Sequence, residues 1–234
     1  MRTTVIIPQF GRSELSVQAV STFQSFHQKD SAEVLIVDDG SESSHLKTLQ
    51  SMLNGNVRIL AQRRRRGVTA AWNLAAQNSQ TEFLVFLNND TLSTGRWLDN
   101  LLDPLSDPQV LLSGSQLRVE HLLPKVCWRN REIRPILSGW CLAIRRSVFE
   151  SINGFDPQFQ LYFSDTDLQC RLLLAASHDR PLEAVPGLLI RHLEHRSTCT
   201  LPTRNRIWRE DRDRFVRKWT DFETEGNDEA ASNL

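Results

Sequence analysis

Residues 83–91 read FLVFLNNDT, so five apolar residues run directly into two carboxamides, a carboxylate and a hydroxyl. An apolar run of this length between polar residues predicts a short strand buried on both faces, as in the middle of a mostly parallel sheet. Ligands of open α/β sheets bind just beyond the carboxyl ends of the strands, so we expect Asp90 at the functional edge. Oxygen-rich side chains there suit Mg²⁺ or Mn²⁺. The alternative is an Asx turn that only ends the strand.

Apolar runs and segments of helical periodicity alternate throughout the first half of the chain. Further strands are expected at residues 5–7, 34–37 and 57–60, and helices at residues 13–26, 46–53, 67–75 and 97–102. This alternation predicts an α/β fold with a mostly parallel central sheet and helices on both faces.

The second half is less regular, and residues 117–136 show no clean periodicity. Strands are expected at residues 110–112, 138–144 and 188–190, and helices at residues 145–152, 165–176 and 204–219. We expect one domain over residues 1–220. The acidic and polar composition of residues 221–234 favours a disordered tail.

The overall composition is that of an ordinary soluble globular protein, with 40% hydrophobic residues and a formal net charge of zero. No global field therefore steers the protein towards nucleic acid or membrane. The four cysteines form no Cys-x-x-Cys pair, which argues against a zinc ribbon and a disulfide-dense secreted scaffold. The apolar part of residues 1–8 is too short for a signal peptide, and no window approaches the ~20 apolar residues of a membrane helix. The expected location is the cytoplasm.

Two acidic clusters could take part in binding or catalysis. Asp38 and Asp39 end the strand at 34–37, where a carboxylate can accept a hydrogen bond from a nucleobase or a ribose. A helix N-cap is the alternative there. Asp165 and Asp167 open a predicted helix, whose dipole would explain one acid but not two. Together they could supply a general base beside a cation and a phosphate.

Basic side chains follow or precede other predicted elements. His192 follows a late strand and could complete a metal site with Asp90, although a lone His is more often structural and His195 competes for the role. Residues 63–66 are four consecutive Arg before Gly67, at a helix N-terminus where one of them could hold a diphosphate. A nucleic-acid patch is the alternative, but no aromatic residues interleave the run, so no nucleic-acid partner is expected.

The segment at residues 204–219 is basic and carries apolar residues at roughly helical spacing, namely Ile207, Trp208, Phe215 and Trp219. A terminal helix packed on the domain is the favoured interpretation. The alternative is a Trp-bearing helix that rests on an anionic surface, which would place the protein at the inner face of a membrane.

Taken together, the motifs resemble those of family 2 glycosyltransferases with the GT-A fold, from residue 5 to about residue 219. The donor-side motifs are VIIP at 5–8, VDDGS at 37–41, GVTAAWN at 67–73 and NND at 88–90. The acceptor-side motifs are NGFD at 153–156 and YFSDTDL at 162–168. Asn88 and Ser164 stand where the family pattern has acidic residues.

The resemblance implies a role for each matching position. Residues 1–115 would bind the nucleotide sugar, through Pro8, Phe10, Asp38, Asp39, Arg66, Gly67, Asn73, Asn88 and Asn89. Residues 116–220 would bind the acceptor, through Gly139, Trp140, Ser164 and Asp167. Asp165 would be the catalytic base, and Asp90 and His192 would hold Mn²⁺ or Mg²⁺.

The implied reaction is transfer of a sugar, with inversion, from a UDP- or dTDP-sugar to a hydroxyl of a saccharide or glycolipid, in bacterial polysaccharide or glycolipid synthesis. A nucleotidyltransferase would show a Gly-rich, Lys-bearing loop after the first strand, which PQFGR at 8–12 lacks. A non-catalytic GT-A-like nucleotide-binding protein is the other alternative, because Asn88 and Ser164 depart from the acidic pattern.

Overall fold

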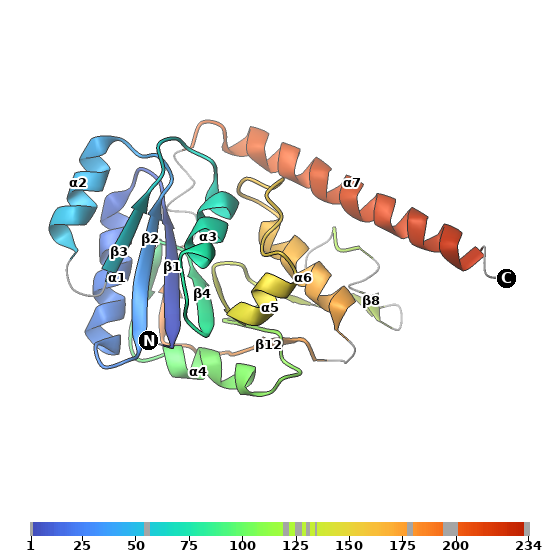
Figure 1. The fold of residues 1–234 in the computed structure, drawn as a ribbon, viewed down its shortest axis with the longest axis horizontal. Helices are drawn as coiled ribbons and strands as arrows, with labels where there is room; N and C mark the ends of the chain where they lie inside the picture. The colour runs from blue at the N-terminus through green and yellow to red at the C-terminus, as the bar shows by residue number, and fades with distance from the viewer. Residues whose placement is uncertain are drawn as a thin grey trace.

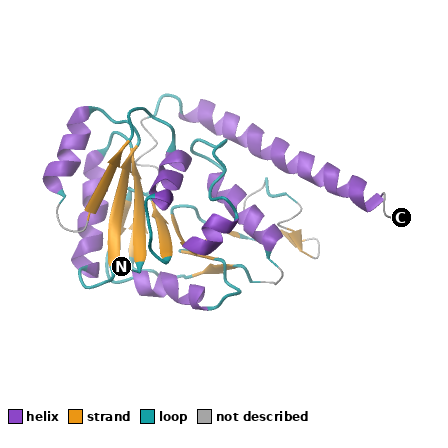
Figure 2. Ribbon diagram, in the orientation of Figure 1, coloured by secondary structure: helices purple, strands orange, loops and turns teal. Residues whose placement is uncertain are grey.

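The computed structural model describes residues 2–53, 57–118, 122–124, 128–129, 132–133, 135–176, 180–193 and 201–231. In this part of the chain a seven-stranded sheet has the order β12-β6-β11-β4-β1-β2-β3 (Figures 1 and 2). Its strands are β1 (Thr3–Gln9), β2 (Ala32–Asp38), β3 (Val57–Ala61), β4 (Phe83–Leu87), β6 (Leu112–Gly114), β11 (Cys141–Arg145) and β12 (Leu182–Ala184).

The sheet is mostly parallel, as the sequence predicts. β1 pairs with β2 and β4, β2 with β3, and β6 with β12, and all of these pairs are parallel. β11 runs antiparallel to β4 and to β6. The carboxyl ends of β1, β2 and β4 therefore meet at one edge of the sheet, and the chain enters β11 at that same edge.

Helices cover both faces of the sheet (Figure 1). α1 (Ser13–His27), α2 (Ser43–Met52) and α4 (Leu98–Leu102) pack on one face, where Val5 and Ile7 of β1 point. α3 (Val68–Gln77), α5 (Arg146–Ser151) and α6 (Ser164–Ala175) pack on the other, with Ile6 of β1. Successive side chains of a strand point to opposite faces, so β1 contributes to both cores. All five residues of β4 are buried, as its apolar run predicts.

The C-terminal helix α7 (Arg204–Ala231) packs through every fourth residue, with Ile207, Asp211, Phe215 and Trp219 buried. Phe215 and Trp219 join a third core cluster with residues from α6 and the segment before it. Trp208 is therefore the one exposed member of the four apolar residues that a membrane-bound helix would use. The helix continues past residue 220, while residues 232–234 lie outside the described part; disorder of the tail stays a prediction.

The structure adds small elements that the sequence pattern does not indicate. A 3₁₀ turn, η1 (Asp103–Ser106), follows α4, and β5 (Thr91–Ser93) is a further strand, which pairs with the late strand that the sequence does predict, β13 (Ile190–His192). β7 (Leu117–Arg118) pairs with β10 (Ile136–Leu137), and β8 (Trp128–Arg129) with β9 (Glu132–Ile133). None of the helices in the described ranges combines the length and the apolar composition that crossing a membrane requires.

Three strands begin two or three residues later than the sequence predicts, and one of them, expected at 138–144, is β11, which begins at Cys141. The strand expected at 110–112 is β6, where the pairing continues over Ser113 and Gly114. The strand expected at 188–190 is β13, which pairs with β5 through Ile190, Arg191 and His192. Small and polar residues carry no apolar signal, so hydrophobic patterning does not find the ends of strands that are fixed by backbone pairing.

Candidate active site

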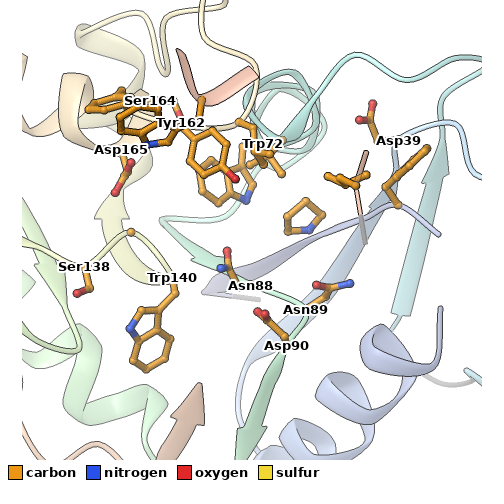
Figure 3. A pocket seen from close by; sticks show the side chains of 18 of the residues that line it. Asp39, Trp72, Asn88, Asn89, Asp90, Ser138, Trp140, Tyr162, Ser164 and Asp165 are labelled. Atoms are coloured by element: carbon orange, nitrogen blue, oxygen red, sulfur yellow. The ribbon is translucent and has the colours of Figure 1, made fainter. Parts of the chain in front are cut away.

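A pocket of ≈ 320 Å³ lies at the carboxyl edge of the sheet and is lined from both halves of the chain (Figure 3). The predicted site residues that line it are Pro8, Phe10, Asp39, Asn88, Asn89, Asp90, Gly139, Trp140, Ser164, Asp165 and His192. Asn89 is tied to the end of β1, because its amide lies 3.4 Å from Oε1 of Gln9 and 3.1 Å from Oγ of Ser16.

Three carboxylates that are distant in sequence share this pocket. Asp39 follows β2, Asp90 follows β4, and Asp165 lies in the first turn of α6. Figure 3 shows them on different sides of the cavity. The parallel pairing of β2 and β4 with β1 brings the first two to one edge, and α6 supplies the third from across it. The arrangement offers separate acidic positions rather than one acidic cluster.

His192 lies beside Asp90, with Nε2 3.1 Å from Oδ1 of the carboxylate. The pairing of β13 with β5 causes this, because His192 is opposite Thr91 and the N–H of Leu193 donates to the carbonyl of Asp90. The imidazole stacks on Trp140, with ring centroids 5.1 Å apart and planes 6° apart. The ring is therefore held on two sides.

Asp90 and His192 offer one oxygen and one nitrogen ligand, a set that Mn²⁺ accepts and that Mg²⁺ accepts less readily. Within the described residues, no group of three or more His, Cys, Asp and Glu side chains could hold a metal ion. A cation at this pair would therefore need further ligands, such as phosphate oxygens of a donor and water. The residues fit a metal that is completed by its substrate.

Asp165 is held between an arginine and a glycine. Its Oδ2 accepts a hydrogen bond of 3.0 Å from Nη2 of Arg118, which also donates to Oγ1 of Thr166 at 2.9 Å. A β-carbon on Gly139 would lie 2.1 Å from the same Oδ2. The absence of a side chain at residue 139 thus leaves the room that the Asp165 carboxylate occupies.

Asp39 is almost fully buried and is surrounded by donors. It accepts hydrogen bonds from the backbone N–H groups of Arg66 (2.7 Å) and Gly67 (2.8 Å), and from Nε2 of Gln62 (3.2 Å). Burial raises the pKa of its carboxyl group, and the two backbone hydrogen bonds act in the opposite direction. An ionised carboxylate has about four acceptor positions, so one remains for a ligand.

The model of the family described as Glycosyl transferase family 2 matches residues 4–168, which is more than half of the chain and includes all three carboxylates. The chain belongs to glycosyl transferase family 2. The resemblance of the sequence motifs is thereby confirmed, and the fold is the GT-A fold, which this chain shares with its structural neighbours.

Two solved structures share the fold of this family 2 chain. A mannosyltransferase from Pyrobaculum calidifontis in complex with GDP-Man and Mn²⁺ aligns with a TM-score of 0.60 at 21% identity, over 80% of this chain and 55% of that one. GalNAc-T7 with UDP, GalNAc and Mn²⁺ aligns with a TM-score of 0.64 at 18% identity, over 82% and 44%.

A curated relative of this family 2 chain is the O-antigen biosynthesis protein RfbC of Myxococcus xanthus. It is 28% identical over 202 residues, which are 73% of this chain and 16% of the relative. The chain thus spans only part of the length of this relative.

Other predicted residues, all within the described ranges, lie outside the pocket. Both ends of the Asn73 amide bind the backbone of Phe155, at 3.0 Å to its N–H and 2.8 Å to its carbonyl. Asp38 accepts hydrogen bonds from the N–H and the hydroxyl of Ser41, but α2 begins later, with Glu42 at its N-cap position. Asn73 and Asp38 thus make contacts that hold loops, and the nucleotide contacts expected of them stay predictions.

Asp167 is fully buried and was expected to contact the acceptor. Its carboxylate accepts 2.8 Å from Nε of Arg171, 3.2 Å from Nε1 of Trp219, and lies 2.7 Å from Nζ of Lys218. These contacts assign Asp167 to the packing of α6 against α7. Arg66 and Gly67 also lie outside the lining, and they serve the site through the backbone N–H groups that hold Asp39.

Several lining residues were not found by sequence reasoning. Arg65 rather than Arg66 reaches the pocket, with its guanidinium carbon 4.4 Å from the ring centroid of Phe10. The run of four Arg residues predicts an arginine near the pocket but does not indicate which of the four lines it. Arg118 and Trp208 also line the pocket, the first from β7 and the second from α7. Both arrive through long-range packing, which leaves no local signal. His195, the rival of His192, lies outside the described residues.

Proposed function

We propose that this chain is an inverting glycosyltransferase, which moves a sugar from a nucleotide diphosphate sugar to an acceptor hydroxyl. The observation that carries the proposal is the meeting of Asp39, Asp90 and Asp165 on one pocket, each on a different element. Asp39 suits a nucleoside, and Asp90 suits a cation and the diphosphate that the cation binds. Asp165 suits the proton of an acceptor hydroxyl.

On the donor side, the base of a UDP- or dTDP-sugar would lie against Phe10, and its N–H would donate a hydrogen bond to the remaining acceptor position of Asp39. Pro8, Asn88 and Asn89 line the same part of the pocket. The two structural neighbours carry different nucleotides, UDP in one and GDP-Man in the other. A test of the donor therefore has to include guanosine as well as uridine and thymidine nucleotides.

On the acceptor side, Asp165 would act as the general base. The acceptor oxygen forms a bond to the anomeric carbon while the bond from that carbon to the β-phosphate oxygen breaks. The hydroxyl proton passes to Asp165, and the nucleoside diphosphate leaves with the electron pair. Arg118 and Gly139 fix the carboxylate, and Trp140 and Ser164 line the space where the acceptor would bind.

Asp90 and His192 would hold Mn²⁺ or Mg²⁺. When bound, the cation stabilises the negative charge that builds on the departing diphosphate. The stacking of His192 on Trp140 keeps its imidazole turned towards Asp90, as an oriented ligand requires.

The setting we propose is the synthesis of a bacterial polysaccharide or glycolipid in the cytoplasm. The relative from Myxococcus xanthus, which is named for O-antigen biosynthesis, supports it. The acceptor would then be a saccharide or a glycolipid. A peripheral membrane contact through residues 204–219 would rest on Trp208 and the exposed cations of α7.

The test is to mix the protein with UDP-, dTDP- and GDP-sugars and Mn²⁺ and to measure the free nucleoside diphosphate. Slow hydrolysis of at least one donor is expected, because water can replace the acceptor. The second candidate is a nucleotide-binding protein without activity, which Asn88 and Ser164 favour because they remove two acids from the family pattern. Tight nucleotide binding with no release from any donor would establish this second candidate.

A further inference from the structure

Asp211 of α7 is fully buried and lies outside the pocket. Its carboxylate accepts hydrogen bonds from three successive backbone N–H groups, those of Gln160 (3.2 Å), Leu161 (2.9 Å) and Tyr162 (2.9 Å). Nη1 of Arg214 donates to it as well, at 2.9 Å. A buried carboxylate with this many charge-assisted hydrogen bonds holds its partners in place.

The same segment is held from its other side by α3. The carbonyl of Gln160 accepts a hydrogen bond of 3.4 Å from the N–H of Thr69. Gly67 passes so near that a β-carbon there would lie 2.4 Å from this carbonyl oxygen. Residues 160–162 thus lie between the start of α3 and the first third of α7.

This segment leads directly into the candidate catalytic residue. Leu161, Tyr162 and Phe163 line the pocket, and α6 then begins at Ser164, one residue before Asp165 (Figure 3). Phe163 has a φ of 62°, in the left-handed region that costs a residue with a side chain free energy. Its ring stacks on Phe215 of α7 at 5.2 Å. α7 therefore holds both the backbone and the strained residue at the entrance to α6.

We propose that Asp211 is a positioning residue for the acceptor side of the site. Through three backbone N–H groups it sets the path of residues 160–163, and hence the place from which Asp165 reaches an acceptor hydroxyl. The inference rests on the proposed function for the role of Asp165. It makes α7 a structural part of the acceptor side, distinct from the strand ends that carry Asp39 and Asp90.

The test compares Asp211→Asn with Asp213→Asn. The first replaces one accepting oxygen by an NH₂ group, which can only donate and would face donors. The second makes the same change on the same helix at an exposed residue that pairs with Arg212. Asp211→Asn is expected to lower the rate of nucleoside diphosphate release at least about tenfold, because small displacements of reacting groups cost large factors in rate. The affinity for UDP with Mn²⁺ should stay within about twofold, and Asp213→Asn should match the parent in both.

Equal release rates for the two folded variants would overturn the proposal. So would a parallel loss of UDP affinity in Asp211→Asn, since that would indicate general loss of structure. Hydrogen exchange supplies a measurement that needs no variant: in the parent protein, the amides of residues 160–162 should exchange slowly although they lie outside helices and strands. Exchange at the rate of an unstructured peptide would show that the hydrogen bonds from these amides to Asp211 are absent.

The exchange measurement also separates this inference from the proposed function. If the parent releases no nucleotide from any donor, the transferase proposal fails. The positioning role of Asp211 is then tested by amide hydrogen exchange alone. Residues 160–168 should exchange faster in Asp211→Asn than in Asp213→Asn, and the exchange rates of β1 and β4 should be the same in both variants. Equal exchange in the two variants would refute the positioning role whatever the activity.

Discussion

A β-carbon added to Gly139 would lie 2.1 Å from Oδ2 of Asp165, far closer than a β-carbon and a non-bonded oxygen can approach. The chain enters β11 immediately after this turn, whereas α6 begins 25 residues later, so the contact joins two separate elements. Space for the carboxylate is thus created by a missing side chain on another element.

Gly139→Ala should therefore push the Asp165 carboxylate out of position. We expect the rate of nucleoside diphosphate release to fall about 100-fold, because a displacement near 1 Å has an effect of this size. Calorimetry should show unchanged nucleotide affinity, because Asp39 and Asp90 are untouched. A variant that releases nucleotide at the parent rate would show that Asp165 needs no such fixed place.

Asp165→Asn and Asp167→Asn form a matched pair, the same change two residues apart on α6. The first should lower turnover about 10²–10⁴-fold with little change in melting temperature, because it removes a proton acceptor. The second should lower the free energy of unfolding by about 3–5 kcal/mol, because Lys218 and Arg171 lose a buried partner. Turnover by release assay and stability by urea denaturation check the pair. Loss of stability in Asp165→Asn and loss of turnover in Asp167→Asn would contradict both roles.

His192→Ala should weaken the response to metal. The Mn²⁺ concentration that gives half-maximal nucleotide release is expected to rise at least about tenfold, because one of two protein ligands is lost. His45→Ala, on α2, serves as the control and should leave this concentration unchanged. If titration with Mn²⁺ gives the same curve for both variants, His192 does not contact the cation.

His27 should make stability depend on pH. Its ring is buried against Phe23 and Trp97, and this burial lowers the pKa of the imidazole below its ordinary value, while Asp30 at 2.5 Å opposes the shift. The unfolded chain then binds more protons, so stability is full above about pH 6.5 and is lost as the pH falls through that value towards the folded pKa.

The melting temperature of the parent should accordingly drop between about pH 7.5 and pH 5.5 by more than that of His27→Gln, which has no imidazole to protonate. Differential scanning calorimetry at the two pH values measures the difference. Equal drops would mean that His27 titrates alike in the folded and unfolded chain.

The strand ends of the first half could be predicted because their signals are local. An apolar run that stops at polar residues defines both the strand and the edge where its last residue lies, and this placed Asp39 and Asp90 correctly at one pocket. Parallel pairing then brings these two residues to the same edge, since the carboxyl ends of parallel strands meet there.

The acceptor side could be predicted only in part, because its residues depend on helix faces and long-range packing. Asp165 and Asp167 look equivalent in sequence, but residues two apart on a helix point in different directions, so one lines the pocket and the other is buried under α7. Arg118 reaches Asp165 only because β7 pairs with β10. Asp211 reaches a loop about fifty residues away, which no periodicity of α7 reveals.

Because β11 runs against its neighbours, the two halves of the chain bring different residues to the functional edge of the sheet. A strand that runs with its neighbours delivers only the residues that follow it to the functional edge, whereas β11 delivers the residues that precede it. If the residues before β11 bind the acceptor, as we propose, exchange of residues 115–140 between relatives would change the acceptor and leave the proposed nucleotide site at the ends of β1, β2 and β4 intact. Relatives that share this fold could in this way make different products through changes in one segment of the sequence.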